Sequence, residues 1–137
     1  KMIKLLLLLS LLISTNAWAE VKGLECKSEA SSSGDIGLEE GSEIFWYRID
    51  FDKGTTKYNA SGQDYLTKLK DLIGVNLRGD SSKLYWREGK AIEVELDRQT
   101  LVLAKLNISF KCTLMNGSQV IRKRDAYFKE ILEKNKI

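Results

Sequence analysis

The sequence predicts a mainly β protein, a small antiparallel barrel or sandwich built as a meander, with one C-terminal helix. Three observations lead to this prediction. Apolar and polar residues alternate in several short segments, and turn-forming clusters separate these segments at intervals of about ten residues. The segment from Ser118 to Ile137 changes to helical spacing. Both a barrel and a sandwich fit such short, regularly spaced strands, and the choice between them stays open.

The N-terminal segment, residues 1–19, has the three parts of a secretory signal peptide. Lys1 and Lys4 provide a basic start, an apolar run follows over residues 5–13, and Ala17-Trp18-Ala19 is a small-x-small cleavage site. The run is shorter than the roughly 20 apolar residues that a membrane-spanning helix needs. We therefore expect cleavage after Ala19 and a single domain over residues 20–137, periplasmic or secreted, with no transmembrane segment after processing.

The two cysteines, Cys26 and Cys112, lie in the first and last predicted strands. In an oxidising compartment an even pair indicates one disulfide. The alternatives are two reduced, buried thiols, or two ligands of a zinc site that lacks partners at usable spacing. A bridge requires the first and last strands to be neighbours or to face each other across the core.

The clearest alternation is in residues 43–51, where four large side chains are predicted to face the core: Phe45, Tyr47, Ile49 and Phe51. A turn at residues 52–54 and a return through Tyr58 complete a hairpin. Before it we expect a strand at residues 21–27 and a loop at residues 29–41.

After the hairpin we expect a short helix at residues 65–73 followed by a strand. The alternative is a loop that runs into a strand through Ile73, Val75 and Leu77. Residues 82–114 then form a meander of four strands, one of which points three side chains inward and two outward: Ile92, Val94 and Leu96, against Glu93 and Glu95. The C-terminal segment, residues 119–137, contains a helix of about 9–12 residues with Asp125 as its N-cap and a frayed, lysine-rich end.

Composition narrows the function classes. Of the 22 basic residues, Lys1 and Lys4 belong to the leader, so the remainder exceeds the 19 acidic residues by one, which argues against a nucleic-acid partner. The absence of histidine excludes Ser-His and Cys-His nucleophile pairs and the commonest metal ligand. We therefore expect no metal site and no cofactor, and we name no catalytic residue.

Two carboxylate pairs, Asp50 with Asp52 and Glu93 with Glu95, have the spacing of one strand face. Such a pair could serve a hydrolase that uses carboxylates alone. The reading we favour is a solvated sheet face, paired with Arg or Lys on a neighbouring strand.

Aromatic and basic side chains are candidates for contact with a partner molecule or a membrane. Trp46, Tyr85 and Trp86 are a possible binding surface for a protein or a glycan, and the alternative is that such residues build the core. The basic C-terminal segment, which includes Arg122, could lie on an anionic membrane. We favour a helix that packs on the sheet edge.

Three segments together carry a resemblance: the strand with Cys26, the hairpin Leu96-Asp97-Arg98-Gln99-Thr100-Leu101, and the strand Phe110-Lys111-Cys112. The chain resembles small uncharacterised exported β proteins of marine bacteria and their phages, in which a hairpin of this kind precedes a closing cysteine strand. Leu96 replaces the usual Ile, and Phe110 stands where Tyr is frequent. The resemblance implies a small antiparallel β fold and export, and no activity.

The stretch Leu84-Tyr85-Trp86-Arg87-Glu88-Gly89-Lys90-Ala91 is similar to a Trp-x-x-Gly-like stretch in bacterial inhibitors of C-type lysozyme, which are also small exported β-barrels. None of their inhibitory residues can be placed on this sequence. We expect a non-catalytic binding or interaction protein whose partner is an envelope or extracellular protein or a glycan. The alternatives are an inhibitor of a secreted enzyme such as lysozyme and a carboxylate-only hydrolase.

Overall fold

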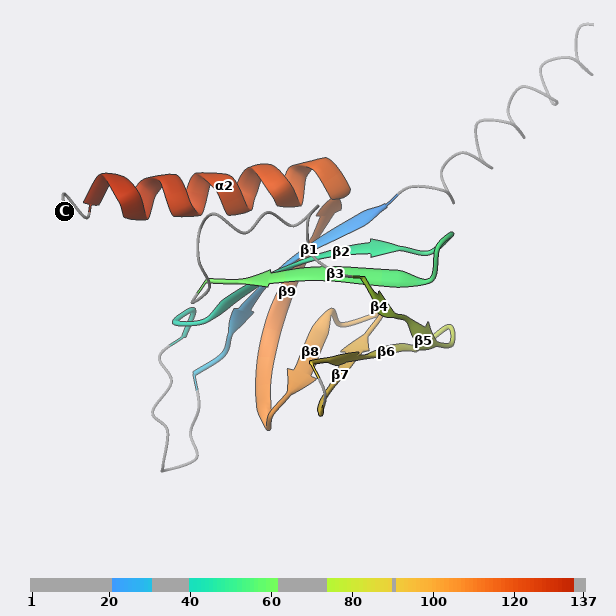
Figure 1. The fold of residues 1–137 in the computed structure, drawn as a ribbon. Coiled ribbons are helices and arrows are strands. Elements are labelled where there is room, and N and C mark those ends of the chain that lie inside the picture. The colour runs from blue at the N-terminus through green and yellow to red at the C-terminus, as the bar shows by residue number, and fades with distance from the viewer. Residues whose placement is uncertain (1–20, 31–39, 62–73, 90, 135–137) are drawn as a thin grey trace, which may run out of the picture.

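The computed structural model describes residues 21–30, 40–61, 74–89 and 91–134, and within these ranges it contains nine strands and one helix (Figure 1). The strands are β1 Lys22–Ser28, β2 Ile44–Asp50, β3 Thr55–Ala60, β4 Val75–Asn76, β5 Arg78–Gly79, β6 Lys83–Glu88, β7 Ile92–Asp97, β8 Val102–Lys105 and β9 Ile108–Asn116; the helix is α2 Gly117–Lys134. Residues 1–19 and the helix predicted at residues 65–73 lie outside the described residues.

The strands form a single antiparallel sheet that is nearly closed into a barrel. Its order is β4-β3-β2-β1-β9-β8-β7-β6-β5, so β4 and β5 lie at opposite ends of the order. Only Leu77 separates these two strands in the chain, and β4 also contacts β6. The mainly β prediction is therefore confirmed, with the barrel-like form, and the four strands β6 to β9 form the predicted meander.

The disulfide joins the two strands that the sequence indicated. Cys26 of β1 lies directly opposite Cys112 of β9, their Cα atoms are 4.0 Å apart, and their sulfurs are bonded. The first and last strands are thus neighbours in the sheet, as predicted. Cys26 is fully buried in the barrel core, where the bridge links distant parts of the chain.

Period-two alternation places one face of each long strand inside the barrel. The predicted inward residues of β7 are confirmed, because Val94 and Leu96 are buried and Ile92 packs against the core. Apart from these, the core cluster contains Leu24, Cys26, Tyr47, Ile49, Leu84, Trp86, Leu103 and Phe110.

Phe51 corrects one core prediction. The strand β2 ends at Asp50, and Phe51 begins the turn that reaches Gly54, whose φ is +60°. The Phe51 side chain is 39% exposed. The predicted alternation extends one step beyond the end of β2, whereas Phe45, Tyr47 and Ile49 do contribute to the core cluster or pack against it.

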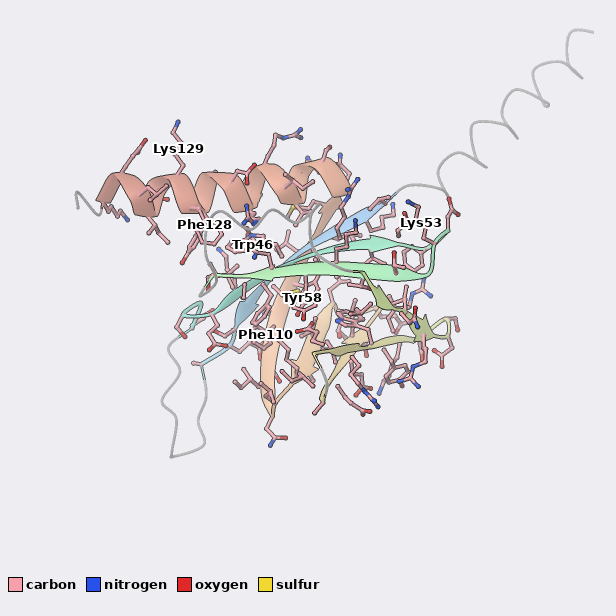
Figure 2. All side chains as sticks on the ribbon, viewed as in Figure 1. Trp46, Lys53, Tyr58, Phe110, Phe128 and Lys129 are labelled. Atoms are coloured by element: carbon pink, nitrogen blue, oxygen red, sulfur yellow. A yellow bond between two sulfur atoms is a disulfide. The ribbon has the colours of Figure 1, made fainter. Side chains whose placement is uncertain are left out.

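The helix α2 covers the outer face of the sheet at β1 and β2, along which it lies in Figure 1. Trp46 points outward from β2 and packs against Tyr127 and Phe128 of the helix, as Figure 2 shows for Trp46 and Phe128. A Cβ added to Gly23 of β1 would lie 2.7 Å from the Cβ of Val120, so a glycine there allows the helix to approach. The helix lies on a face of the sheet, which corrects the predicted edge position.

The start of α2 corrects a second prediction. The helix begins at Gly117 and has 18 residues. Asn116 is its N-cap: its Oδ1 accepts a hydrogen bond from the Gln119 backbone N–H at 2.8 Å, and its own N–H donates to Gln119 Oε1 at 3.0 Å. This reciprocal pair is a capping box, so Asp125 lies inside the helix. Within the described segments, no helix combines the length and apolar character needed to cross a lipid bilayer.

Candidate functional site

The barrel interior has two chemically different ends. Inward positions near the β2–β3 turn carry aliphatic residues, and we call this region the apolar end: Leu24, Ile49, Leu84 and Leu96. Inward positions at the opposite end carry a hydrogen-bonded group that we call the polar end: Tyr47, Trp86, Glu88 and Lys105. Figure 2 shows Tyr58 and Phe110 on this inner side of the sheet, away from the helix.

The apolar end opens into a cavity of about 170 Å³. Its walls are the four leucine and isoleucine side chains of the apolar end, and its rim is formed by Phe51, Leu101 and Leu114. Phe51 and Leu114 are 39% and 53% exposed, so the apolar lining extends to the surface. The two remaining lining residues are cationic, Lys22 and Arg98.

Leu101 is held at this rim in an uncommon backbone conformation. Its φ is +58°, in the left-handed region that branched apolar residues rarely occupy. Its N–H donates to the Asp97 carbonyl at 2.9 Å, and its carbonyl accepts from the Cys112 N–H at 3.0 Å. These bonds fix the strained residue from both sides, as is frequent at ligand-contacting positions.

Arg98 is oriented over the same rim. Its Nη1 donates to the Asp80 backbone carbonyl at 2.8 Å, and its guanidinium carbon lies 5.5 Å from the centre of the Phe51 ring. Asp80 Oδ1 accepts bonds from its own turn, from the Ser82 N–H at 2.7 Å and the Lys83 N–H at 2.9 Å. These bonds to Lys83 and Ser82 lower the pKa of Asp80.

Lys105 organises the polar end. Its Nζ donates to Glu88 Oε1 at 2.7 Å and to the Tyr47 hydroxyl at 2.8 Å, and it lies 3.0 Å from the centre of the Phe45 ring. Glu88 Oε2 accepts from Trp86 Nε1 at 2.9 Å. Glu88 and Lys105 are only 3% and 5% exposed, so this ion pair is inside the barrel.

Burial dominates the protonation behaviour of the polar end. It lowers the pKa of Lys105 to about 8, although the charge of Glu88 acts in the opposite direction. Burial and, second, the charge of Glu88 raise the pKa of Tyr47 well above its ordinary value. The low-dielectric interior thus favours the neutral form of each group.

The sequence contained an unused signal for this network. Lys105 follows Leu103, and Glu88 follows Trp86, each by two residues on the same strand. Continuing the inward alternation by one step places both charged residues inside the barrel.

The three aromatic residues predicted as a binding surface lie in different environments. Trp46 is fully buried beneath α2, where its Nε1 donates to Glu25 Oε2 at 3.0 Å. Trp86 is 1% exposed in the barrel core, and Tyr85 is 36% exposed on the outside of β6. The structure therefore does not bring Trp46, Tyr85 and Trp86 together on one surface.

The carboxylates on β7 pair with cations of the neighbouring strand. Glu93 lies 3.0 Å from Arg87, and Glu95 lies 2.7 Å from Lys83, both in β6. Asp50 accepts a hydrogen bond from the Lys53 N–H in its own turn. Within the ranges that the structure describes, no group of three or more His, Cys, Asp or Glu residues is placed to hold a metal ion.

The basic side chains of α2 divide between the interior and the solvent. Arg124 is 2% exposed and donates from Nε to Asn59 Oδ1 of β3 at 2.6 Å. Lys134 pairs with Glu130 at 3.3 Å on the exposed side, and Lys129 points away from the sheet in Figure 2. One cation of the basic segment therefore serves to dock the helix.

Comparisons of the chain with protein-family models, with curated proteins and with solved structures find no match. The two resemblances drawn from the sequence therefore stay predictions.

Proposed function

We propose that this protein is a non-catalytic binding protein that takes a small apolar group into the cavity at the apolar end of the barrel. The observation that carries the proposal is the cavity of about 170 Å³, which is walled by aliphatic side chains and open at the rim. A protein cavity of about 150 Å³ with a similar lining is large enough to bind benzene. Concave, mostly apolar sites with a few polar groups are typical of small-molecule binding.

The setting of the cavity supports this proposal. The strained Leu101 is part of the rim, and Arg98 is held over it by Asp80 and Phe51. The disulfide between Cys26 and Cys112 supports an oxidising compartment, so we place the binding activity in the periplasm or outside the cell.

A cavity-filling substitution tests the proposal. We expect benzene and indole to raise the melting temperature of the protein and to shift the amide resonances of Leu84 and Leu96. Leu84→Phe fills the cavity and should abolish both effects, whereas Leu132→Phe, on the exposed side of α2, should preserve them. Leu114→Trp, which blocks the rim from an exposed position, serves if Leu84→Phe does not fold. Equal binding by the filled and control variants would refute the proposal.

A second candidate function, inhibition of a secreted enzyme, is favoured by the β8–β9 turn. Leu106 is 65% exposed at its tip, and Leu106 and Asn107 both have positive φ, +52° and +61°. An aliphatic side chain that projects from a tight turn can serve as an anchor in a pocket of another protein. If so, the protein should inhibit C-type lysozyme and Leu106→Asn should abolish the inhibition. Unchanged lysozyme turnover with the wild-type protein in excess would reject lysozyme as the target.

A further inference from the structure

The charged residues at the cavity rim indicate that the ligand is negatively charged. Among the described residues, the side chains that line the cavity are seven apolar ones and two cations, Lys22 and Arg98, and none of them is a carboxylate. We infer that the ligand is a small carboxylic acid, with its apolar part in the cavity and its carboxylate at Arg98 and Lys22. This inference rests on the proposed function and specifies its ligand.

Arg98 has the geometry that recognition of a carboxylate requires. Among the described residues, no carboxylate forms a direct ion pair with Arg98, although its charge, after the hydrogen bonds within the turn, contributes to the lowered pKa of Asp80. Its Nη1 donates to the Asp80 backbone carbonyl, and its guanidinium carbon lies 5.5 Å from the centre of the Phe51 ring. A guanidinium has five N–H donors, so this bond leaves others for a ligand. These two contacts hold the side chain in place, so a ligand carboxylate would meet an already oriented donor group.

Lys22 adds a second positive charge from another strand. It stands two residues before Leu24 on β1 and lies opposite Ile49 of β2, so period-two alternation places it on the inner face beside the cavity. Arg98 comes from the turn between β7 and β8, on the other side of the rim. A ligand anion at the mouth would be near both cations, and Arg98 is its main contact because Lys22 already takes part in another interaction.

The cavity limits the apolar part of the ligand. About 170 Å³ accommodates a group near the size of benzene, so a six-membered ring or a branched alkyl group fits and a long acyl chain does not. 3-Phenylpropionate has this combination of ring and carboxylate. A peptide that ends in phenylalanine presents the same chemistry from a different source.

The experiment compares three probes that share one ring and differ in charge. Titration calorimetry on the disulfide-bonded protein would measure 3-phenylpropionate, 3-phenylpropanamide and 3-phenylpropylamine. We expect the acid to bind about tenfold more tightly than the amide, because charge-assisted hydrogen bonds are stronger than neutral ones. The amine should bind more weakly than the amide.

Three charge-removing variants locate the contact. Arg98→Gln and Lys22→Gln should each weaken binding of the acid, Arg98→Gln by about tenfold, and leave the amide within about twofold. Lys111→Gln removes an exposed cation of β9 that does not line the cavity, so it should change neither affinity. Circular dichroism would verify that each variant is folded.

The outcomes separate the inference from the proposed function. Equal affinities for acid and amide, unchanged in Arg98→Gln, would overturn the inference and leave an apolar binding site. If none of the three probes binds and benzene also fails, the proposed function itself is wrong. Tighter binding of acetyl-Ala-Phe than of 3-phenylpropionate would assign the carboxylate to a peptide C-terminus, and the reverse order would assign it to a free acid.

Discussion

The two ends of the barrel interior share side chains of β2 and β6, yet one end is occupied by buried polar groups and the other is open and apolar. At the polar end, Lys105, Glu88 and Tyr47 satisfy one another at 2.7–2.8 Å. At the apolar end, aliphatic side chains such as Leu84 and Leu96 surround a cavity of about 170 Å³. The difference indicates that the polar end maintains the barrel, while the apolar end has space for another molecule.

The energy terms at the two ends also differ. A buried ion pair loses hydration that its mutual attraction only partly restores, so it is a weak source of stability but a sensitive one when a partner is removed. Apolar walls around a cavity give up packing contacts that a ligand could restore. Substitutions at the polar end should therefore lower the free energy of unfolding strongly, and substitutions at the rim of the apolar end should lower it only slightly.

The disulfide should give the largest effect on stability. It joins residues separated by 86 positions, so replacing both cysteines by alanine should lower the free energy of unfolding by about 4–5 kcal/mol in the chain-entropy estimate. Guanidinium unfolding of the double variant against wild type measures the change. An unchanged midpoint would mean that the bridge does not constrain the barrel.

Tyr47 and Phe51 belong to the same alternating pattern, so alanine substitutions at both positions compare the stability contributed by the core with that contributed by the rim. Tyr47→Ala should destabilise by about 3–5 kcal/mol, because Tyr47 is fully buried in the core. Phe51→Ala should cost about 1 kcal/mol, since the ring is 39% exposed at the rim, where its centre lies 5.5 Å from the Arg98 guanidinium carbon. Urea unfolding of both variants measures this difference, and similar losses would contradict the placement of Phe51.

Removing one member of the buried ion pair should also be costly. Lys105→Met leaves Glu88 charged and without its cation, and we expect a loss of about 3–5 kcal/mol. Adding Glu88→Gln should restore most of it, because the neutral amide still accepts from Trp86. Lys83→Met, in the exposed pair with Glu95, is the control and should change stability little. Additive losses in the double variant would exclude coupling between Lys105 and Glu88.

The pH dependence of the free energy of unfolding should reveal the contribution of Lys105. Its pKa is about 8 in the folded protein, against 10.5 ordinarily. Between these values the unfolded chain holds a proton that the folded protein has released, so the free energy of unfolding should rise with pH. The raised pKa of Tyr47 acts oppositely only above about pH 10. Urea unfolding between pH 8 and 10 should show the rise in wild type but not in Lys105→Met; equal slopes would contradict it.

The smallest expected effect is a gain in stability at the β8–β9 turn. Leu106 occupies the left-handed region at φ +52°, which asparagine tolerates better than leucine. Leu106→Asn should therefore stabilise the protein by about 0.5–1 kcal/mol. Leu132→Asn, at an exposed helical position, should instead destabilise slightly because asparagine is a poorer helix former. Thermal unfolding of the pair tests whether the turn is strained, and a loss in both would show that it is not.

Local pattern was sufficient for the longer strands, for the turn before β3 and for the disulfide. Alternation along β2 and β7 identifies the inward faces, glycines at positions 54 and 89 have the positive φ that their turns need, and Cys26 has Cys112 as its single possible partner. These features depend on neighbours in the chain or on a pairing with one solution. The same reasoning failed for the start of α2, because the Asn116–Gln119 capping box was overlooked in favour of Asp125.

The burial of Trp46, the contacts of Lys105 and the cavity depend on the closed sheet and could not be predicted from local sequence. Trp46 has the alternation of an outward residue, and it is buried because α2 folds back over β2. Lys105 meets Tyr47 across 58 positions of sequence, and the cavity between β1, β2, β6 and β7 exists only when those strands surround one interior. Contacts of this kind depend on register and on barrel closure, which bring together residues whose local sequences carry no information about one another.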